Sequence, residues 1–140
     1  MVVNRENVFN GLQAAGLLGN QNYYFNGFVL PTIGQYAILG VFAGVLNSFS
    51  GYLINVTERG VGILPIASSN GRFVTERAVM LPYQYIARVE AKNGGLFAYK
   101  NIDIITVNNE KISFKVTKKV LPNPDHLNNV NYFLSMFHAL

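Results

Sequence analysis

The chain has 140 residues, which is enough for one ordinary domain. Of these residues 50% are apolar and only 13% are charged, whereas a typical globular protein is about 25% charged. So little charge favours self-association or a membrane-facing patch over a freely solvated monomer. The chain contains no cysteine, which excludes disulfides, thiolate catalysis and cysteine-ligated zinc.

The net charge of +4 comes from eleven lysines and arginines that are scattered from Arg5 to Lys119. Nucleic-acid-binding proteins usually concentrate their basic residues in a stripe or tail, so nucleic acid is disfavoured as a partner. Arg5 and Glu6 interrupt the first residues where a secretory signal would need an apolar run. We therefore expect a cytoplasmic protein.

A helix is predicted near the N-terminus. Asn4 is a suitable N-cap, Glu6 places a negative charge in the first turn, and Gly16 or Gly19 can end the helix. The apolar residues that recur at helical spacing are Val8, Leu12 and Ala15. The aromatic cluster 23–25 that follows is predicted to anchor the core or an interface.

No charged residue lies between Glu6 and Glu58. Within this span, Phe28 to Phe49 has nearly the length of a membrane helix, but its continuous apolar part, 36–46, is too short to cross a bilayer. We predict a buried strand or a short core helix there, with an apolar surface for oligomerisation or membrane contact as the alternative. The candidate interface residues are Tyr23, Tyr24, Phe25, Phe28, Phe42, Val45 and Phe49.

From residue 51 onward, short apolar runs are separated by turn signals, a spacing typical of an all-β sandwich or barrel. Pro65 suggests an edge position or a strand end. Together with 36–46, this pattern predicts seven strands. The other six are 52–57, 61–66, 72–80, 84–92, 96–107 and 111–118.

The last two strands are predicted to form a hairpin. A three-residue loop at 108–110 keeps the apolar residues on one face, and Asn109 suits the left-handed position that such a loop needs. The cross-strand pairs predicted by this loop are Ile104 with Phe114, Ile102 with Val116, and Asp103 with Lys115.

A closing helix is predicted with Asn123 as N-cap, Pro124 as first helical residue and Asp125 in the first turn. We expect it to lie across one open end of the β structure. Its apolar stripe consists of Leu127, Val130, Phe133, Leu134 and Phe137.

Side chains able to carry catalysis are sparse. His126 and His138 both fall on the closing helix, about 18 Å apart, so they cannot share a metal or a proton. No glycine-rich stretch has the order of a nucleotide-binding loop. We therefore predict no enzymatic activity, no cofactor and no metal. The densest basic group contains Lys111, Lys115, Lys118 and Lys119, and the candidate contacts to an anionic partner are Arg72, Arg77, Lys111, Lys115 and Lys119.

Three segments resemble small bacterial PH-like (bPH, GRAM-related) proteins over about residues 36–140. They are Gly51 to Val61 with its Thr-Glu-Arg turn, Leu81 to Ile86 with its Pro-Tyr pair, and the final hairpin with its closing helix. The resemblance implies a mainly β fold, a seven-stranded antiparallel open barrel or sandwich capped by a C-terminal helix, here with an additional N-terminal helix.

The resemblance also implies a binding or scaffold module without catalysis. Eukaryotic members often bind phosphoinositide head groups through basic residues of the first hairpin loop. The corresponding loop in this chain, 47–51, contains no lysine or arginine. A homo-oligomer or a protein partner is therefore the better expectation.

We accordingly predict one domain, with a helix and apolar arm at 1–35 and the PH-like body at 36–140. Its predicted function is a cytoplasmic interaction or scaffold module that self-associates through the uncharged N-terminal third. One alternative is a peripheral membrane or lipid-binding protein. Another is a small carrier of an apolar ligand.

Overall fold

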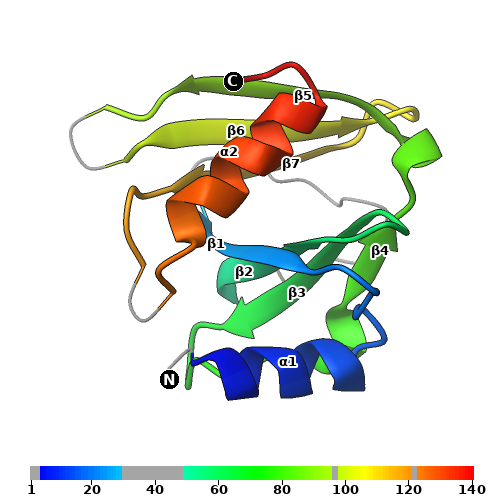
Figure 1. The fold of residues 1–140 in the computed structure, drawn as a ribbon, viewed down its shortest axis with the longest axis vertical. Helices are drawn as coiled ribbons and strands as arrows, with labels where there is room; N and C mark the ends of the chain where they lie inside the picture. The colour runs from blue at the N-terminus through cyan, green and yellow to red at the C-terminus, as the bar shows by residue number, and fades with distance from the viewer. Residues whose placement is uncertain (1–3, 30–48, 96–97, 121–122) are drawn as a thin grey trace.

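The computed structural model describes residues 4–29, 49–95, 98–120 and 123–140. They form one seven-stranded antiparallel sheet of order β4-β3-β2-β1-β7-β6-β5, with a helix toward each end of the chain (Figure 1). The strands are β1 (Tyr23–Val29), β2 (Phe49–Val56), β3 (Val61–Ala67), β4 (Val79–Leu81), β5 (Ile86–Asn93), β6 (Lys100–Thr106) and β7 (Lys111–Val116). The helices are α1 (Arg5–Ala14), α2 (His126–Met136) and the short 3₁₀ turns η3 (Thr75–Arg77) and η4 (Tyr83–Tyr85). This confirms the predicted mainly β, PH-like architecture with its closing helix and its additional N-terminal helix.

The sheet folds over into two layers, with β5, β6 and β7 above and β1 to β4 below in Figure 1. Strand β1 belongs to both layers because it pairs with β2 on one side and with β7 on the other. A glycine makes this junction possible. A Cβ atom at Gly27 would lie 2.6 Å from Cδ2 of Phe114, so only glycine allows the Phe114 ring to pack on β1.

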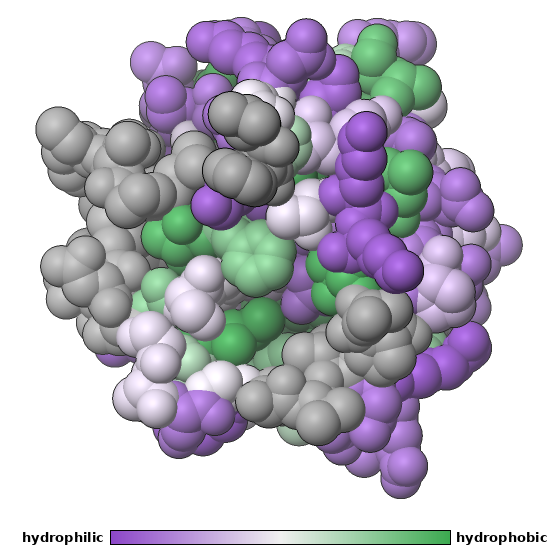
Figure 2. All heavy atoms as spheres, turned by 90° about the vertical axis from the view of Figure 1, so that its left-hand side faces the viewer, coloured by the Kyte–Doolittle hydropathy of each residue, from purple (hydrophilic) through white to green (hydrophobic). Residues whose placement is uncertain are grey.

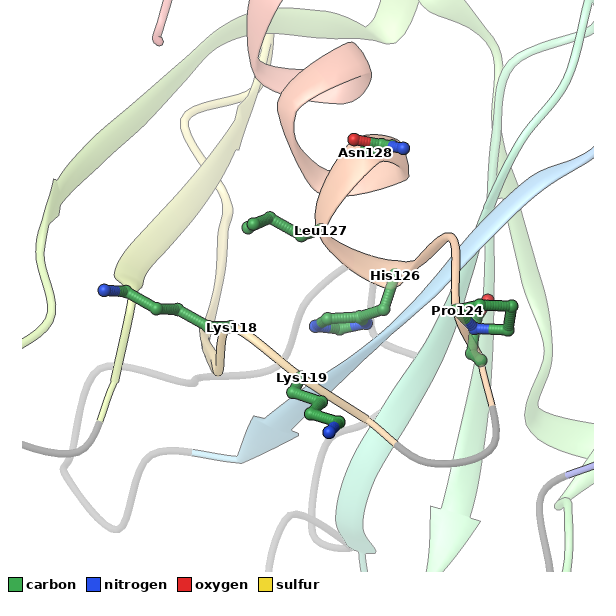
Figure 3. A pocket seen from close by; sticks show the side chains of 7 residues that line it. Lys118, Lys119, Pro124, His126, Leu127 and Asn128 are labelled. Atoms are coloured by element: carbon green, nitrogen blue, oxygen red, sulfur yellow. The ribbon is translucent and has the colours of Figure 1, made fainter.

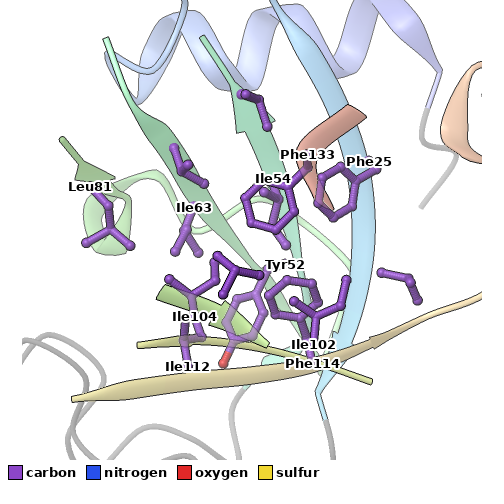
Figure 4. Packing of buried hydrophobic residues seen from close by; sticks show 14 of the residues in the cluster. Phe25, Tyr52, Ile54, Ile63, Leu81, Ile102, Ile104, Ile112, Phe114 and Phe133 are labelled. Carbon is purple, nitrogen blue, oxygen red and sulfur yellow. The ribbon is translucent and has the colours of Figure 1, made fainter. Parts of the chain in front are cut away.

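The main core lies between the two layers and α2. Figure 4 shows side chains from both layers converging there, with Phe133 of α2 beside Phe25 of β1. The ring of Phe25 lies 5.5 Å from that of Phe133 and 6.3 Å from that of Phe114, measured between centroids. Burial of each such ring contributes about 1.5–3 kcal/mol to folding, so this aromatic trio fixes α2 on the sheet.

A second core lies on the outer face of β2 and β3, beneath α1. Asn4 caps the helix as predicted, because its Oδ1 accepts a hydrogen bond from the Asn7 N–H at 2.8 Å, and Gly16 ends it with a φ of 73°. The buried members of this cluster are Val8, Leu12, Leu17, Leu53, Leu64 and Phe73. Residues 51–57 of β2 and its following turn are therefore buried on both faces, and part of the uncharged N-terminal third is interior rather than contact surface.

The turn between β2 and β3 holds the loop that follows α1. The Glu58 carboxylate accepts hydrogen bonds from the N–H groups of Asn20, at 2.8 and 3.0 Å, and Gln21, at 3.1 Å. These backbone donors lower the pKa of Glu58. The Arg59 guanidinium donates to the carbonyl of Gly16 at 3.1 Å and to that of Leu18. The Thr-Glu-Arg turn that carried the family resemblance thus has a structural role, because it holds the loop after α1 in place.

The seven strands are not all the predicted ones. The predicted strand 36–46 lies outside the described residues, and the first strand of the sheet is β1, inside the segment predicted as a helix and apolar arm. The predicted strand 72–80 is replaced by η3 and the short β4, because Phe73 turns into the second core under α1. Pro65 lies inside β3, beyond the last pair that β3 makes with β4, in keeping with an edge position rather than a strand end. No helix in the described ranges is long and apolar enough to cross a membrane.

The β6–β7 hairpin differs from the predicted register by two residues. Ile104 faces Ile112, and Asp103 faces Ser113, whose Oγ donates to the Asp103 carboxylate at 2.6 Å. The three-residue loop is 107–109, closed by a Thr106 N–H bond to the Glu110 carbonyl at 2.9 Å. Asn109 is left-handed as predicted, with a φ of 66°. A two-residue shift leaves every side chain on its face, so the apolar pattern alone could not distinguish the two registers.

Helix α2 begins at His126 with Asp125 as its N-cap, two residues later than predicted. Asn123 instead shapes the turn before the helix, because its Oδ1 accepts a hydrogen bond from the Asp125 N–H at 3.1 Å. Proline at position 124 therefore precedes the helix rather than opening it. The fully buried apolar members of the predicted stripe are Val130, Phe133 and Leu134.

Candidate ligand-binding site between β7 and α2

Strand β1 has a complete partner on one side only. It pairs with β2 from Tyr23 to Phe28, but among the described residues its pairs with β7 are limited to Phe28 and Val29. The first half of β1 therefore diverges from β7. Backbone polar groups left unpaired inside a protein are costly, so another element has to satisfy them.

The start of α2 fills this gap with side chains. The Tyr24 carbonyl accepts one hydrogen bond from Asn123 Nδ2 at 3.2 Å and another from Asn129 Nδ2 at 2.9 Å. The Asn26 N–H donates to Nδ1 of His126 at 3.5 Å. Two amides and an imidazole thus replace the missing ladder of β7.

His126 also reaches the end of β7. Its Nε2 lies 2.8 Å from the Thr117 carbonyl, which can only accept, so Nε2 carries the proton and Nδ1 accepts. The side chain is 1% exposed. Burial lowers the pKa of His126 below 6.5, although the Thr117 carbonyl opposes that shift. At neutral pH His126 is therefore an uncharged bridge between the two diverging strands.

A cavity of about 630 Å³ lies beside this bridge. In Figure 3 the His126 ring lies at the centre, with Lys118, Lys119, Pro124 and Leu127 around it. The segment after β7 is held in place by a Thr117 Oγ1 bond to the Lys119 carbonyl, at 3.0 Å. The lining residues are Lys118, Lys119, Asn123, Pro124, His126, Leu127 and Asn128.

The charge of this lining is one-sided. It contains two lysines and no carboxylate. Neither Lys118 nor Lys119 forms an ion pair with a carboxylate of the described residues. Pro124, Leu127 and the His126 ring supply apolar surface. The geometry suits a ligand with an anionic group and an apolar part.

A second cavity, of about 510 Å³, lies on the other side of the Asn123–Pro124 corner and is lined by residues from α1, β1 and α2. It contains both Arg5 and Asp125, so its charges balance. The Arg5 guanidinium lies 5.2 Å from the centre of the Phe9 ring. This cavity therefore lacks the charge asymmetry of the first.

Figure 2 shows the side of the molecule on which the segment after β7 lies in Figure 1. Apolar side chains are exposed in the middle of this face, with polar side chains around them. The described residues thus present a partly apolar area on this face.

The predicted interface residues do not form one surface. Phe25 and Phe49 are buried in the main core and offer no contact surface, which corrects their prediction as interface residues. Tyr23 packs on Tyr132 of α2, with ring centroids 4.5 Å apart, and Tyr24 packs on Phe9. Phe28 is 39% exposed. The two remaining candidates, Phe42 and Val45, lie outside the described residues.

The predicted anionic-partner contacts are dispersed as well. Arg72 and Arg77 lie between β3 and β4, on the side of α1, and Arg72 pairs with Glu76 at 3.8 Å. The other candidates, Lys111 and Lys115, lie along β7. Lys119 alone of the five lines the cavity, together with Lys118 from the same dense basic group.

The sequence analysis missed the bridging role of His126. The signal that could have revealed it is a run of uncharged hydrogen-bonding residues, Asn123, Asn128, Asn129 and Asn131, around a histidine at a helix start. Asn123 was instead interpreted as a cap, and His126 was considered only as a possible catalytic or metal-binding residue.

Within the described part of the chain, no three His, Asp or Glu side chains come close enough to hold a metal ion. Comparison of the chain with family models, with curated proteins and with solved structures gave no match in any of the three.

Proposed function

We propose that this chain is a non-catalytic binding module of PH-like fold, and that the cavity between β7 and α2 is its ligand site. The observation that carries the proposal is the cavity itself. Its volume of about 630 Å³ falls within the range of about 300–1,000 Å³ that is usual for small-molecule sites. Apolar surface and two lysines meet in it, which is the composition of a binding pocket.

The groups around the cavity favour holding a ligand over transforming it. General acid–base catalysis needs a titratable group that can exchange a proton with the ligand. Both nitrogens of His126 are engaged by Asn26 and Thr117, and no carboxylate lines the cavity. The two lysines can attract an anion without reacting with it.

A fluorescent anionic dye, 8-anilinonaphthalene sulfonate, tests the site directly. We expect saturable binding of one dye per chain, and loss of that binding in Leu127→Asp, which places a negative charge in the apolar wall. Val107→Asp is the matched control, because Val107 is exposed after β6 and does not line the cavity. Binding without saturation, or equal loss in both variants, would contradict the proposal.

Self-association is a second candidate function, and a specific observation favours it on α2. Tyr132 and Met136 are four residues apart on α2 and are 43% and 37% exposed. The helix itself carries no Asp, Glu, Lys or Arg. Such an uncharged face can pack against a second copy.

Light scattering at increasing concentration tests this candidate. We expect a mass above that of one chain, and a monomer for Met136→Lys. Ser135→Lys introduces the same charge at an exposed neighbouring position and should keep the wild-type mass. A concentration-independent monomer mass would remove self-association and leave the ligand-site proposal standing.

A further inference from the structure

We infer that the cavity between β7 and α2 takes a single-chain anionic amphiphile, a soluble long-chain carboxylate, with its head at Lys118 and Lys119 and its tail along Leu127 and Pro124. This inference rests on the proposed function and specifies the ligand class of the same site. Three properties of the lining carry it: the distribution of charge, the commitment of its polar atoms, and its division into a basic part and an apolar part.

The charge asymmetry selects an anion. Lys118 and Lys119 are both exposed, and neither makes an ion pair or a side-chain hydrogen bond with another described residue. The nearest acidic residue in sequence, Asp125, lines the second cavity with Arg5 instead. An anionic head group would therefore meet two ammonium groups without a competing carboxylate.

The commitment of the polar atoms of Asn123 and His126 disfavours a ligand with many polar groups. Asn123 uses Nδ2 for the Tyr24 carbonyl and Oδ1 for the Asp125 N–H. His126 uses Nδ1 for Asn26 and Nε2 for Thr117. A peptide or a sugar in the cavity would lose hydrogen bonds to water and find few replacements, since among the lining side chains only Asn128 and the two lysines lack a described partner.

The rest of the cavity lining is an apolar wall with a basic end. Leu127 and Pro124 are apolar, the edge of the buried His126 ring is uncharged, and lysine stems can cover apolar surface while their amines stay in water. An acyl chain needs no hydrogen bonds and is stabilised by each methylene that it removes from water. A carboxylate with such a chain satisfies both parts of the lining at once.

The closing experiment is a calorimetric titration of the full chain with dodecanoate and, separately, with dodecyltrimethylammonium, both below their micelle concentrations. The two probes share one tail and differ in head-group charge. We expect one dodecanoate per chain and affinity lower by about tenfold or more for the cationic probe. Equal affinity for the two probes would overturn the anionic part of the inference.

Charge reversal tests the two lysines. In Lys118→Glu/Lys119→Glu we expect the dodecanoate affinity to fall by about tenfold, because two attractions become two repulsions. Lys111→Glu is the matched control, since Lys111 is exposed at the start of β7 and lines neither cavity. Backbone amide NMR spectra confirm that each variant is folded. An unchanged affinity in the double variant would overturn the inference.

Vesicles and the dye separate the remaining outcomes. Sedimentation with phosphatidylglycerol vesicles, without uptake of monomeric dodecanoate, would overturn the inference in favour of a membrane surface. Saturable binding of 8-anilinonaphthalene sulfonate without binding of dodecanoate would overturn the ligand class but keep the site. Failure of both small probes would remove the site and the inference together.

Discussion

Two contacts fasten distant parts of the chain to its N-terminal region, and they use opposite chemistry. The β2–β3 turn holds the loop after α1 with the exposed charges of Glu58 and Arg59. The start of α2 holds β1 with the neutral groups of Asn123, His126 and Asn129. At the turn, backbone groups of the loop after α1 make hydrogen bonds to both charged side chains. At α2 the fastening needs no charge, which leaves the adjacent lysines available for a ligand.

The largest expected effect comes from breaking the α2 contact at its buried bridge. His126→Ala should lower the free energy of unfolding by about 2–4 kcal/mol, because it leaves a cavity and strands the Asn26 N–H and the Thr117 carbonyl. Urea unfolding measures the change. His138→Asn, at the exposed end of the helix, should shift the free energy of unfolding by less than about 0.5 kcal/mol. Equal effects of the two substitutions would refute the bridging role.

A smaller effect is expected from the two amides that share one acceptor. Asn123→Ala and Asn129→Ala each leave the Tyr24 carbonyl with one donor, whereas the double variant leaves it with none. We expect the double variant to lose about 1 kcal/mol more than the sum of the single losses. A double-mutant cycle by urea unfolding gives this coupling directly. Additive losses would show that the shared acceptor is not shielded from water.

The two contacts should also weaken in different pH ranges. His126 has a lowered pKa because burial favours its neutral form, so the unfolded chain binds a proton first and stability falls as pH drops below 6.5. Glu58 has a lowered pKa because backbone N–H groups favour its charged form. Its contribution to folding stability is therefore lost as pH drops below 4.5. Unfolding free energies measured across this range should show two declines. His126→Gln should remove the upper one only.

The smallest effect is expected at the exposed turn. Glu58→Gln should lower the melting temperature slightly, because a neutral amide oxygen is a weaker acceptor for the Asn20 and Gln21 N–H groups. Glu90→Gln is the matched control. Its carboxylate is also exposed with a lowered pKa, but its partner is the Arg88 side chain in the same strand. Loop protection measured by hydrogen exchange at Asn20 and Gln21 should change only for Glu58→Gln.

Local signals in the sequence predicted much of the fold. The cap at Asn4, the left-handed Asn109 and the buried face of α2 each depend on neighbours within a few residues, so their residue types were sufficient. The hairpin register failed because shifts of two residues preserve the apolar face. The choice of Asp103 and Lys115 as partners relied on charge, whereas the Ser113 hydroxyl supplies the actual partner of Asp103.

The candidate site could not be derived in the same way. It exists because β1 and β7 diverge after two pairs, and that divergence is a property of the folded sheet. Asn26 and His126 are 100 residues apart in the chain, so no local pattern connects them. Lys119 was selected as a basic residue, but the sequence could not show that it borders a cavity while Arg72 pairs with Glu76.

The burial of β2 on both faces has a consequence for how the molecule opens. Residues 51–57 have the main core on one side and α1 on the other, and β2 has hydrogen-bonded neighbours along both edges. No local fluctuation can bring their amides to solvent without separating both cores. The amides of Leu53 and Ile54 should therefore exchange with deuterium only when the whole domain unfolds, so that their exchange rates report its global stability.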